Sequence, residues 1–220
     1  MQWRKKNEVA QMSEKTFPYE FHEVGGIYPF GEDVNGNVVL HVRIRLFIRV
    51  PPILELLKRY TIYHLVNADE MAARKGRGWI LLLDCTDTGF ANSDLEMANF
   101  LVSVLRNYFP SGQKYILIHN LPWFLNAIKN VVFTMLPSNV KRRIKSSNER
   151  TITEYISLAN LPDYLNGEGG DAYRVIPANV KTTVQLAKEG TFKLSEDDLQ
   201  KVAKYYEKVR DIINETKKIS

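Results

Sequence analysis

The segment GWILLLDCTDTG, residues 78–89, carries a continuous apolar run that ends at Asp84 and then passes into turn residues. A short apolar run bounded in this way is typical of a strand buried on both faces of a sheet. A second run of the same kind, KYILIHN, covers residues 114–120. Both segments are therefore predicted to be inner strands.

A helix is predicted between the two runs. Asn92 or Ser93 can cap its amino terminus. It is expected to reach about Tyr108 and to stop before Pro110, because proline does not continue a helix. The order of strand, helix, strand and helix predicts an α/β fold with a mainly parallel sheet covered by helices.

The chain before this unit predicts one more strand and a long helix. Asn35-Gly36 is a strong turn signal. In residues 38–47 apolar side chains alternate with polar ones such as His41 and Arg43, which predicts an edge or half-exposed strand. Residues 53–76 have apolar spacings of three and four and are predicted to form a helix of several turns.

The stretch HNLPWFLNAIKNVVFTMLPSNVKRR, residues 119–143, follows the second buried run. Its apolar residues form pairs that recur every four positions, which predicts a helix with one broad apolar face. The apolar part lasts only about 14 residues and contains Lys129, whereas crossing a bilayer core takes about 20 apolar residues. This excludes a transmembrane span and leaves an ordinary core helix or a helix that opens onto a membrane.

Four cations follow this helix, namely Lys141, Arg142, Arg143 and Lys145. Cations beside an apolar helix are typical of elements that lie on an anionic membrane surface. They also occur at solvated helix ends, where they interact favourably with the helix dipole. The residues alone leave both interpretations open.

The carboxyl-terminal part differs in composition from the rest. Residues 147–170 are predicted to form a short helix or a strand–helix pair that ends in glycine-rich turns. After residue 177 a further helix is predicted to start at a capping box of Ser195 and Asp198. Its apolar residues are spaced by three and four, so the helix is expected either to dock on the domain or to meet a partner protein.

Composition restricts the class of function. The 220 residues carry a net charge of +5, which favours anionic partners such as phospholipid surfaces. Nucleic-acid binding is not predicted, because the basic residues do not alternate with aromatic ones in a recognisable pattern. Cys85 is the single cysteine, which indicates a reducing, cytoplasmic environment and excludes a zinc–cysteine cluster. Residues 1–15 lack the apolar segment of a secretory signal.

Catalytic and metal sites receive little support from the residues. Asp84 and Asp87 follow a buried strand, where open α/β sheets place catalytic groups, but their spacing favours a role in a turn over a hydrolase site. Cys85 has no helper base near it in sequence and is predicted to be an inert buried thiol. No metal-ligand spacing occurs among the histidines, which are His22, His41, His64 and His119. No catalytic residue, metal or cofactor is therefore predicted.

Three segments in register resemble one known family. They are LLLDCTDTG (81–89), NYFPSGQKYILIHNLPWFLNAIKNVV (107–132) and TITEYISLANLPDYLNG (151–167). In order and spacing they are similar to the core of the CRAL-TRIO lipid-binding domain. The chain most closely resembles the CRAL-TRIO domains of motile-sperm-domain-containing proteins, in which a tryptophan–arginine pair such as Trp3-Arg4 precedes the domain. The resemblance assigns residues 1–177 to the domain, without its usual amino-terminal helical bundle, and residues 178–220 to an extension.

This resemblance implies a sheet floor with helices around an apolar cavity that holds one lipid or lipophilic molecule. The helix that begins at Trp123 would be a mobile gate, and the cations after it would contact an anionic membrane. The implied cavity and gate residues are Leu81, Leu83, Ile116, Ile118, Trp123, Phe124, Ala127, Ile128, Val131, Val132, Met135 and Leu136. The implied membrane-contact residues are Lys141, Arg142, Arg143 and Lys145.

The expected function is non-enzymatic binding and transfer or presentation of a lipid. Family members that bind phosphoinositides tend to have a lysine in the gate helix, where this chain has Phe133, so a phosphoinositide headgroup site is not carried over. Peripheral membrane association in the cytoplasm is expected, at the endoplasmic reticulum if the full-length protein has a motile-sperm domain and an anchor. The alternatives are a protein-interaction module that uses the C-terminal helix and, less favoured, a hydrolase that uses Asp84.

Overall fold

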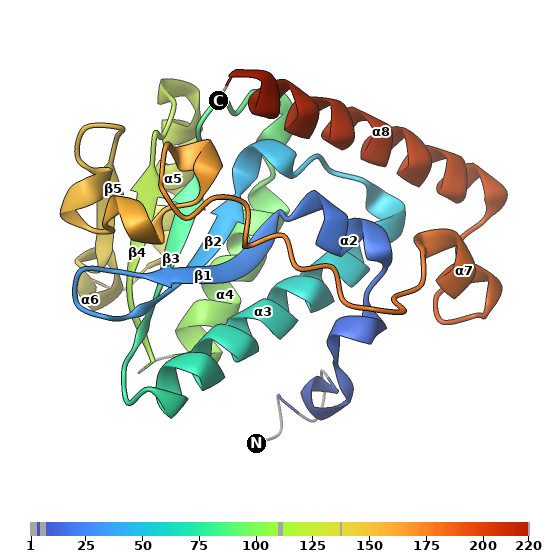
Figure 1. The fold of residues 1–220 in the computed structure, drawn as a ribbon, viewed down its shortest axis with the longest axis horizontal. Helices are drawn as coiled ribbons and strands as arrows, with labels where there is room; N and C mark the ends of the chain where they lie inside the picture. The colour runs from blue at the N-terminus through green and yellow to red at the C-terminus, as the bar shows by residue number, and fades with distance from the viewer. Residues whose placement is uncertain (1–3, 5–7, 110–111, 137, 220) are drawn as a thin grey trace.

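The computed structural model describes residue 4 and residues 8–109, 112–136 and 138–219. In this part of the chain, five strands form one sheet in the order β1-β2-β3-β4-β5 (Figure 1). The strands are β1 (Ile27–Glu32), β2 (Val38–Arg43), β3 (Trp79–Asp84), β4 (Gln113–His119) and β5 (Ile144–Ser147). The helices are α2 (Tyr19–Val24), α3 (Leu54–Arg74), α4 (Leu95–Tyr108), α5 (Asn126–Met135), α6 (Ser138–Lys141), α7 (Thr183–Lys188) and α8 (Glu196–Ile219). Trp3, the first residue of the expected tryptophan–arginine pair, lies outside the described residues.

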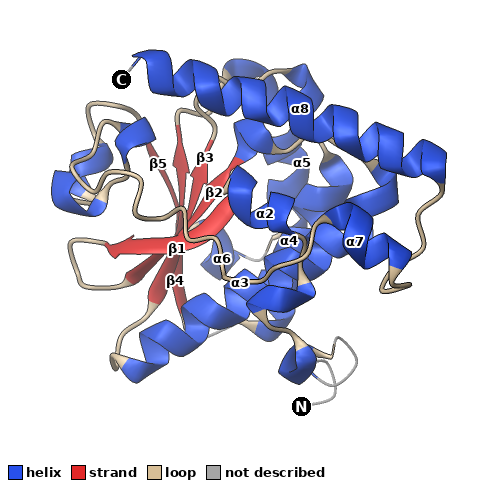
Figure 2. Ribbon diagram, turned by 45° about the vertical axis from the view of Figure 1, so that its right-hand side comes forward, coloured by secondary structure: helices blue, strands red, loops and turns tan. Residues whose placement is uncertain are grey.

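The predicted α/β class with a mainly parallel sheet is confirmed. β1 pairs with β2 in the antiparallel direction, and every other pair of neighbours is parallel. The parallel connections run through α3, then α4, then α5 and α6, and each moves to the next strand in the same direction. Because such crossovers are right-handed, their helices lie on one face of the sheet. Figure 2 shows α4 and α5 beside the sheet with α8 above them.

The two predicted inner strands are confirmed as β3 and β4. The side chains of Trp79, Ile80, Leu81 and Leu82 are fully buried, as expected for a strand covered on both faces. Alternate residues of β3 belong to different cores, since Leu81 packs with the crossover helices and Ile80 and Leu82 pack with the segment after β5. The fold therefore places two separate apolar layers on the two faces of the sheet.

The prediction of an edge strand at residues 38–47 was wrong in two respects. β2 lies between β1 and β3, and even Arg43 is only 5% exposed. The strand also ends at Arg43, and residues 44–46 form a 3-10 turn. Sequence reasoning missed β1, which contains Pro29 and covers the edge of β2. Proline is tolerated there because an edge strand need not donate every backbone hydrogen bond.

The segment after β5 covers the second face of the sheet without forming an α-helix. It contains 3-10 turns at Ile152–Glu154, Leu158–Asn160 and Asp163–Leu165, so the predicted helix is corrected. Ile156 and Leu161 are fully buried in the core of that face. Pro162 interrupts the chain between the turns and prevents a continuous helix.

The amino terminus of α4 is capped differently from the prediction. Asp94, rather than Asn92 or Ser93, is the cap residue, and its carboxylate accepts a hydrogen bond from the Met97 N–H at 2.9 Å. The Asn92 amide instead donates to the carbonyl oxygens of Arg45 and Phe47 at 2.9 and 2.7 Å. Asn92 therefore fixes the loop that follows β2.

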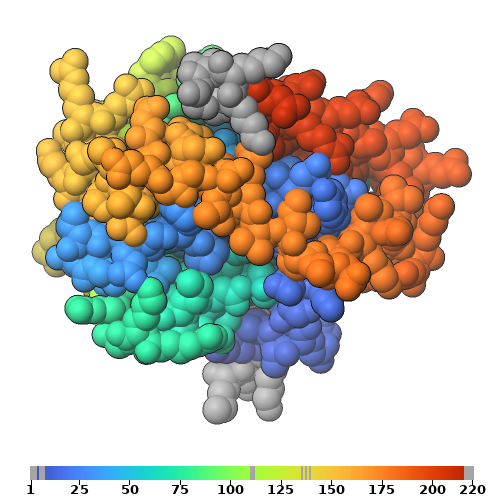
Figure 3. Space-filling view, viewed as in Figure 1, coloured from blue at the N-terminus to red at the C-terminus, as the bar shows by residue number. Residues whose placement is uncertain are grey.

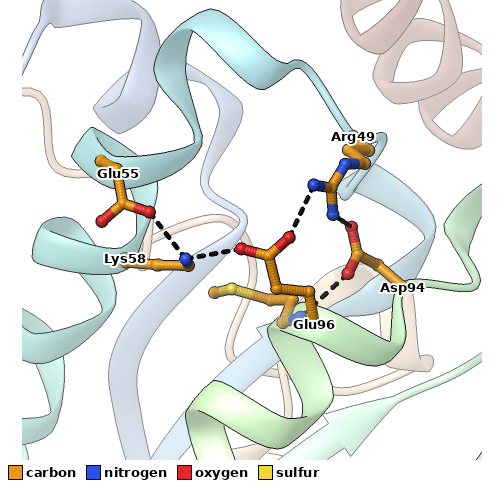
Figure 4. Close-up of polar contacts among 6 residues, drawn as sticks. Arg49, Glu55, Lys58, Asp94 and Glu96 are labelled. Carbon is orange, nitrogen blue, oxygen red and sulfur yellow. Dashed lines mark hydrogen bonds and ion pairs between the residues drawn. The ribbon is translucent and has the colours of Figure 1, made fainter.

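A network of ion pairs links this cap to the neighbouring elements (Figure 4). Arg49 binds Asp94 at 2.8 Å and Glu96 at 2.6 Å, and Glu96 also binds Lys58 of α3 at 2.8 Å. Glu55 accepts a further bond from Lys58 at 2.7 Å. Ion pairs near the surface stabilise a fold little when taken singly, but together these pairs connect the loop after β2, α3 and α4 at one end of the sheet.

The carboxyl-terminal helix α8 docks on the domain. Its buried residues Val202, Tyr206 and Val209 belong to the same core as the residues of α3. The predicted capping box is confirmed, since the Asp198 N–H donates to Ser195 Oγ at 3.2 Å and the Ser195 N–H donates to Asp198 Oδ2 at 3.1 Å. The segment that leads to α8, drawn in orange, lies across the blue amino-terminal segments in Figure 3.

Burial of His64 on α3 makes stability depend on pH. Burial lowers the pKa of His64 from 6.5 to about 3, and neither ring nitrogen has a hydrogen-bond partner among the described residues. As pH falls below about 6.5, the unfolded state takes up a proton that the native state excludes. The free energy of unfolding therefore decreases by up to about 1.4 kcal/mol per pH unit. The stability that comes from keeping His64 neutral is fully present above about pH 6.5 and is lost as pH falls.

We predict that His64→Phe reduces the loss of unfolding free energy between pH ~6.5 and ~5 by about 1–2 kcal/mol. Phenylalanine keeps the ring among Tyr60 and Tyr63 and removes the titrating group. Urea unfolding at a series of pH values measures the effect, with the wild-type chain as the reference. An identical slope in the two proteins would contradict the prediction.

Candidate functional site

A cavity of about 410 Å³ lies between the crossover-helix face of the sheet and the helices. Its volume is in the range of sites that hold small apolar ligands. Apolar side chains form most of its wall, and α2, α3, α4, α5, α6 and α8 all contribute to it. The arrangement can enclose a molecule that avoids water.

The floor of the cavity consists of alternate residues of the inner strands. Leu83, Ile116 and Ile118 line it. Leu81 points to the same face but is fully buried in the main core, and it does not line the cavity. Val42 of β2, which was not among the expected residues, completes the floor.

The helix expected to act as a gate consists of a 3-10 turn at Trp123–Leu125 followed by α5. Ile128, Val132 and Leu136 line the cavity, together with Leu125. These four are spaced by three and four residues, which places them on one side of the helix.

The first members of three of the expected pairs, Trp123, Ala127 and Val131, face outward. Trp123 is 79% exposed, Val131 is 45% exposed, and Ala127 is also exposed. Adjacent helical residues are about 100° apart, so two neighbouring apolar residues do not both fit the strip that covers a cavity. Phe124 is half-buried, and its ring lies 4.4 Å from the ring of Phe90. The side chain of Met135 lies outside the described residues.

One end of the cavity carries hydrogen-bond donors. Gln113 opens β4 and Arg143 directly precedes β5, so both lie at the edge where the parallel strands begin. Gln113 is 8% exposed, lines the cavity, and its Nε2 has no partner among the described residues. Arg143 Nη1 donates to the Gln113 carbonyl oxygen at 3.4 Å. A polar group that accepts hydrogen bonds can therefore bind at this end.

The opposite end lies beyond the edge where the strands finish. Phe47, which follows β2, and Tyr205 of α8 line it. The Tyr205 hydroxyl donates to the carbonyl oxygen of Leu46 at 3.1 Å. Sequence reasoning missed Tyr205 and Tyr206, because α8 lies far along the chain. The apolar stripe on that helix was the available signal, but it did not identify which surface the helix covers.

A lysine of the gate helix also lies at the wall. Lys129 lines the cavity one turn before Phe133, and Phe133 lines it as well. The position at which the resemblance placed the phosphoinositide lysine is therefore apolar.

The four cations expected to contact a membrane do not form one group. Lys141 ends α6 and Arg142 is exposed just after it, whereas Arg143 lies at the cavity. Lys145 is in β5, and its Nζ lies 4.3 Å from the centre of the Tyr115 ring on the other face of the sheet. The sequence did not predict β5, whose alternation separates these side chains.

A row of polar residues lies across the ends of four neighbouring strands. Arg43, Asp84, His119 and Ser147 are in register and are all buried. His119 Nδ1 and Ser147 Oγ are 3.0 Å apart. Burial raises the pKa of Asp84, while a hydrogen bond from the Thr86 N–H at 3.0 Å and the charges of His119 and Arg43 oppose the shift.

The geometry does not favour catalysis by the residues first considered. Strand alternation puts the Asp84 side chain on the face away from the cavity. Asp87 has a positive φ of 52° and pairs with Arg45 at 3.0 Å, which fits a role in a turn. Cys85 lines the cavity, but burial raises the pKa of its thiol to about 12. Among the described residues no cluster of histidine, cysteine and carboxylate side chains could hold a metal ion.

No helix in the described ranges has both the length and the apolar character needed to cross a bilayer.

Comparison with known proteins agrees with this architecture. The family model described as the CRAL/TRIO domain matches residues 22–167, which is more than half of the chain. The chain is similar to a solved structure titled "Crystal structure of Sfh5", with a TM-score of 0.60 and 9% identity over 88% of this chain and 74% of that chain. At that identity the likeness supports the fold, and the motile-sperm-domain subtype stays a prediction. The chain belongs to the CRAL/TRIO domain family.

Proposed function

We propose that this chain binds one lipid or lipophilic molecule in the cavity and exchanges it at a membrane surface, without catalysing a reaction on it. The observation that carries the proposal is an apolar cavity of about 410 Å³ in a chain of a family whose domains bind lipids. Keeping a 16-carbon tail out of water is favourable by roughly 13 kcal/mol, at ~0.8 kcal/mol per methylene. An enclosed cavity retains most of that free energy while the lipid is away from a bilayer.

The lipid is oriented by the two ends of the cavity. Its polar group binds near Gln113 and Arg143, because an unpartnered buried amide N–H favours an acceptor oxygen. Its tail lies along the apolar floor toward Phe47 and Tyr205. This polarity favours lipids with a carboxylate, phosphate or ester oxygen at one end.

The gate helix is the part that meets the membrane. Trp123 and Val131 present apolar surface outward, and Phe90, whose ring packs against Phe124, is 72% exposed. Aromatic side chains of this kind favour the interface between lipid and water. Lys141 and Arg142, at the far end of the gate, add attraction to anionic headgroups of about 1 kcal/mol each. A peripheral location on cytoplasmic membranes follows from this proposal.

Identification of a co-purified lipid tests the central proposal. Native mass spectrometry of the whole chain should detect a bound lipid that denaturing conditions release. Protein that remains empty after incubation with vesicles would overturn the proposal. It would favour the interaction module, although α8 buries its apolar face within this domain.

We predict that Val132→Asp lowers the loading of a fluorescent fatty acid added in solution, without vesicles, at least tenfold, while Val131→Asp, which changes only the outer surface, leaves that loading unchanged. Val132 lines the cavity, and an unpartnered carboxylate there costs several kcal/mol. Val131 is the adjacent residue and is 45% exposed, so it is a matched control for charge and helix propensity. Fluorescent-lipid uptake measures both variants, and equal loading by the two would contradict the assignment of the inner face.

We predict that the double variant Lys141→Glu, Arg142→Glu weakens binding to anionic vesicles roughly tenfold or more at low salt. The difference should shrink as salt increases, because exposed charges are screened. Reversal of Lys188 and Lys193, which are exposed elsewhere on the chain, gives the same change in net charge and serves as the control. Vesicle sedimentation at two salt concentrations checks this, and equal losses in the two double variants would show that net charge alone governs binding.

A further inference from the structure

The carboxyl-terminal helix supplies part of the cavity although it lies outside the matched family region. The family model ends at residue 167, and α8 begins at Glu196. Tyr205 and Tyr206 of α8 nevertheless line the cavity. This part of the wall therefore lies outside the region that the family model matches.

Several contacts fix α8 against the domain. Tyr206 and Thr183 hydroxyls are 3.1 Å apart, and the Thr183 hydroxyl donates to Glu20 Oε2 at 3.0 Å. Arg210 donates to Glu23 Oε2 at 2.7 and 3.0 Å. Together with the buried apolar stripe of α8, these bonds make the helix a rigid wall rather than a moving one.

Tyr205 differs from its neighbour in its surroundings. Tyr206 is 4% exposed and is held in the core, whereas Tyr205 is half-buried. Burial among neighbouring atoms raises the pKa of Tyr205 well above its ordinary value. Tyr205 therefore keeps part of its surface free of protein contact, and it lines the cavity. Its hydroxyl is fixed by the Leu46 carbonyl oxygen.

We propose that the ring of Tyr205 is the stop at the tail end of the cavity and determines which tail length the protein accepts. The inference rests on the proposed lipid binding. The strand from Gln113 to His119 spans about 20 Å at ~3.3 Å per residue. One lipid tail occupies about half of a ~30 Å hydrocarbon core, or about 15 Å, and therefore fits between the donor end and the stop.

The test uses the full chain and vesicles that contain saturated fatty acids and diacyl phospholipids of graded tail length. Bound species are quantified by native mass spectrometry. Tyr205→Ala should shift the bound population to longer tails, by about tenfold or more in the ratio between lipids that differ by two methylenes. Tyr205→Phe keeps the ring and should leave the distribution unchanged.

A second variant acts in the opposite direction and keeps the test decisive if Tyr205→Ala does not fold. Ala98, one turn into α4, also lines the cavity, and Ala98→Leu should shift binding to shorter tails. If the wild-type chain and the folded variants bind lipids with the same distribution of tail lengths, the role of Tyr205 is overturned and the proposed function remains. A wild-type chain that takes up none of these lipids would overturn the proposed function itself.

Discussion

A right-handed crossover places its helix on a defined side of a parallel sheet, and in this chain three crossovers advance in the same direction. The helices α3, α4 and α5 consequently share one face. In a doubly wound sheet, by contrast, the strand order reverses and helices cover both faces. The space above the sheet is therefore bounded by several helices at once, and a ligand can be enclosed there without opening the sheet.

Strand alternation then separates apolar from polar side chains at the ends of the strands. Val42, Leu83 and Ile118 face the cavity, while Asp84 and His119, which follow Leu83 and Ile118, face the other side. Arg43 also touches the cavity wall, but its guanidinium carbon lies 3.9 Å from the centre of the Tyr164 ring. Two members of the row of polar residues have hydrogen-bond partners, since His119 Nδ1 lies 3.0 Å from Ser147 Oγ and Asp84 Oδ1 accepts from the Thr86 N–H at 3.0 Å. Arg43 Nη1 is buried without a hydrogen-bond partner among the described residues. The cavity floor is mostly apolar because strand alternation directs Asp84 and His119 to the opposite face.

The sequence predicts those features that depend on local pattern. β3, β4, α3 and the capping box of α8 follow from apolar runs, spacing and cap residues, and the structure has them. β1 contains Pro29 and β5 is a short polar segment, so neither carries a strand signal, and only pairing with a neighbour forms them. The recurring apolar pairs predicted the helix that includes α5, but they did not predict which member of each pair faces inward. That choice depends on how the helix packs on the sheet. The contribution of Tyr205 depends on a contact with Leu46 across the whole chain, which no local pattern contains.

The distribution of packing indicates which wall can move. The residues of α3, α4 and α8 belong to one large core, so displacing any of them exposes much buried apolar surface. The gate helix instead shares a small cluster whose buried members are Cys85, Ile118 and Leu125. Segments with few buried apolar contacts open at the lowest free energy. Under the proposed function, α5 is the wall whose displacement exposes the least buried apolar surface, and α8 is the wall that stays in place. In such an arrangement α5 can move to open the cavity while the length of the cavity, which selects the ligand, stays the same.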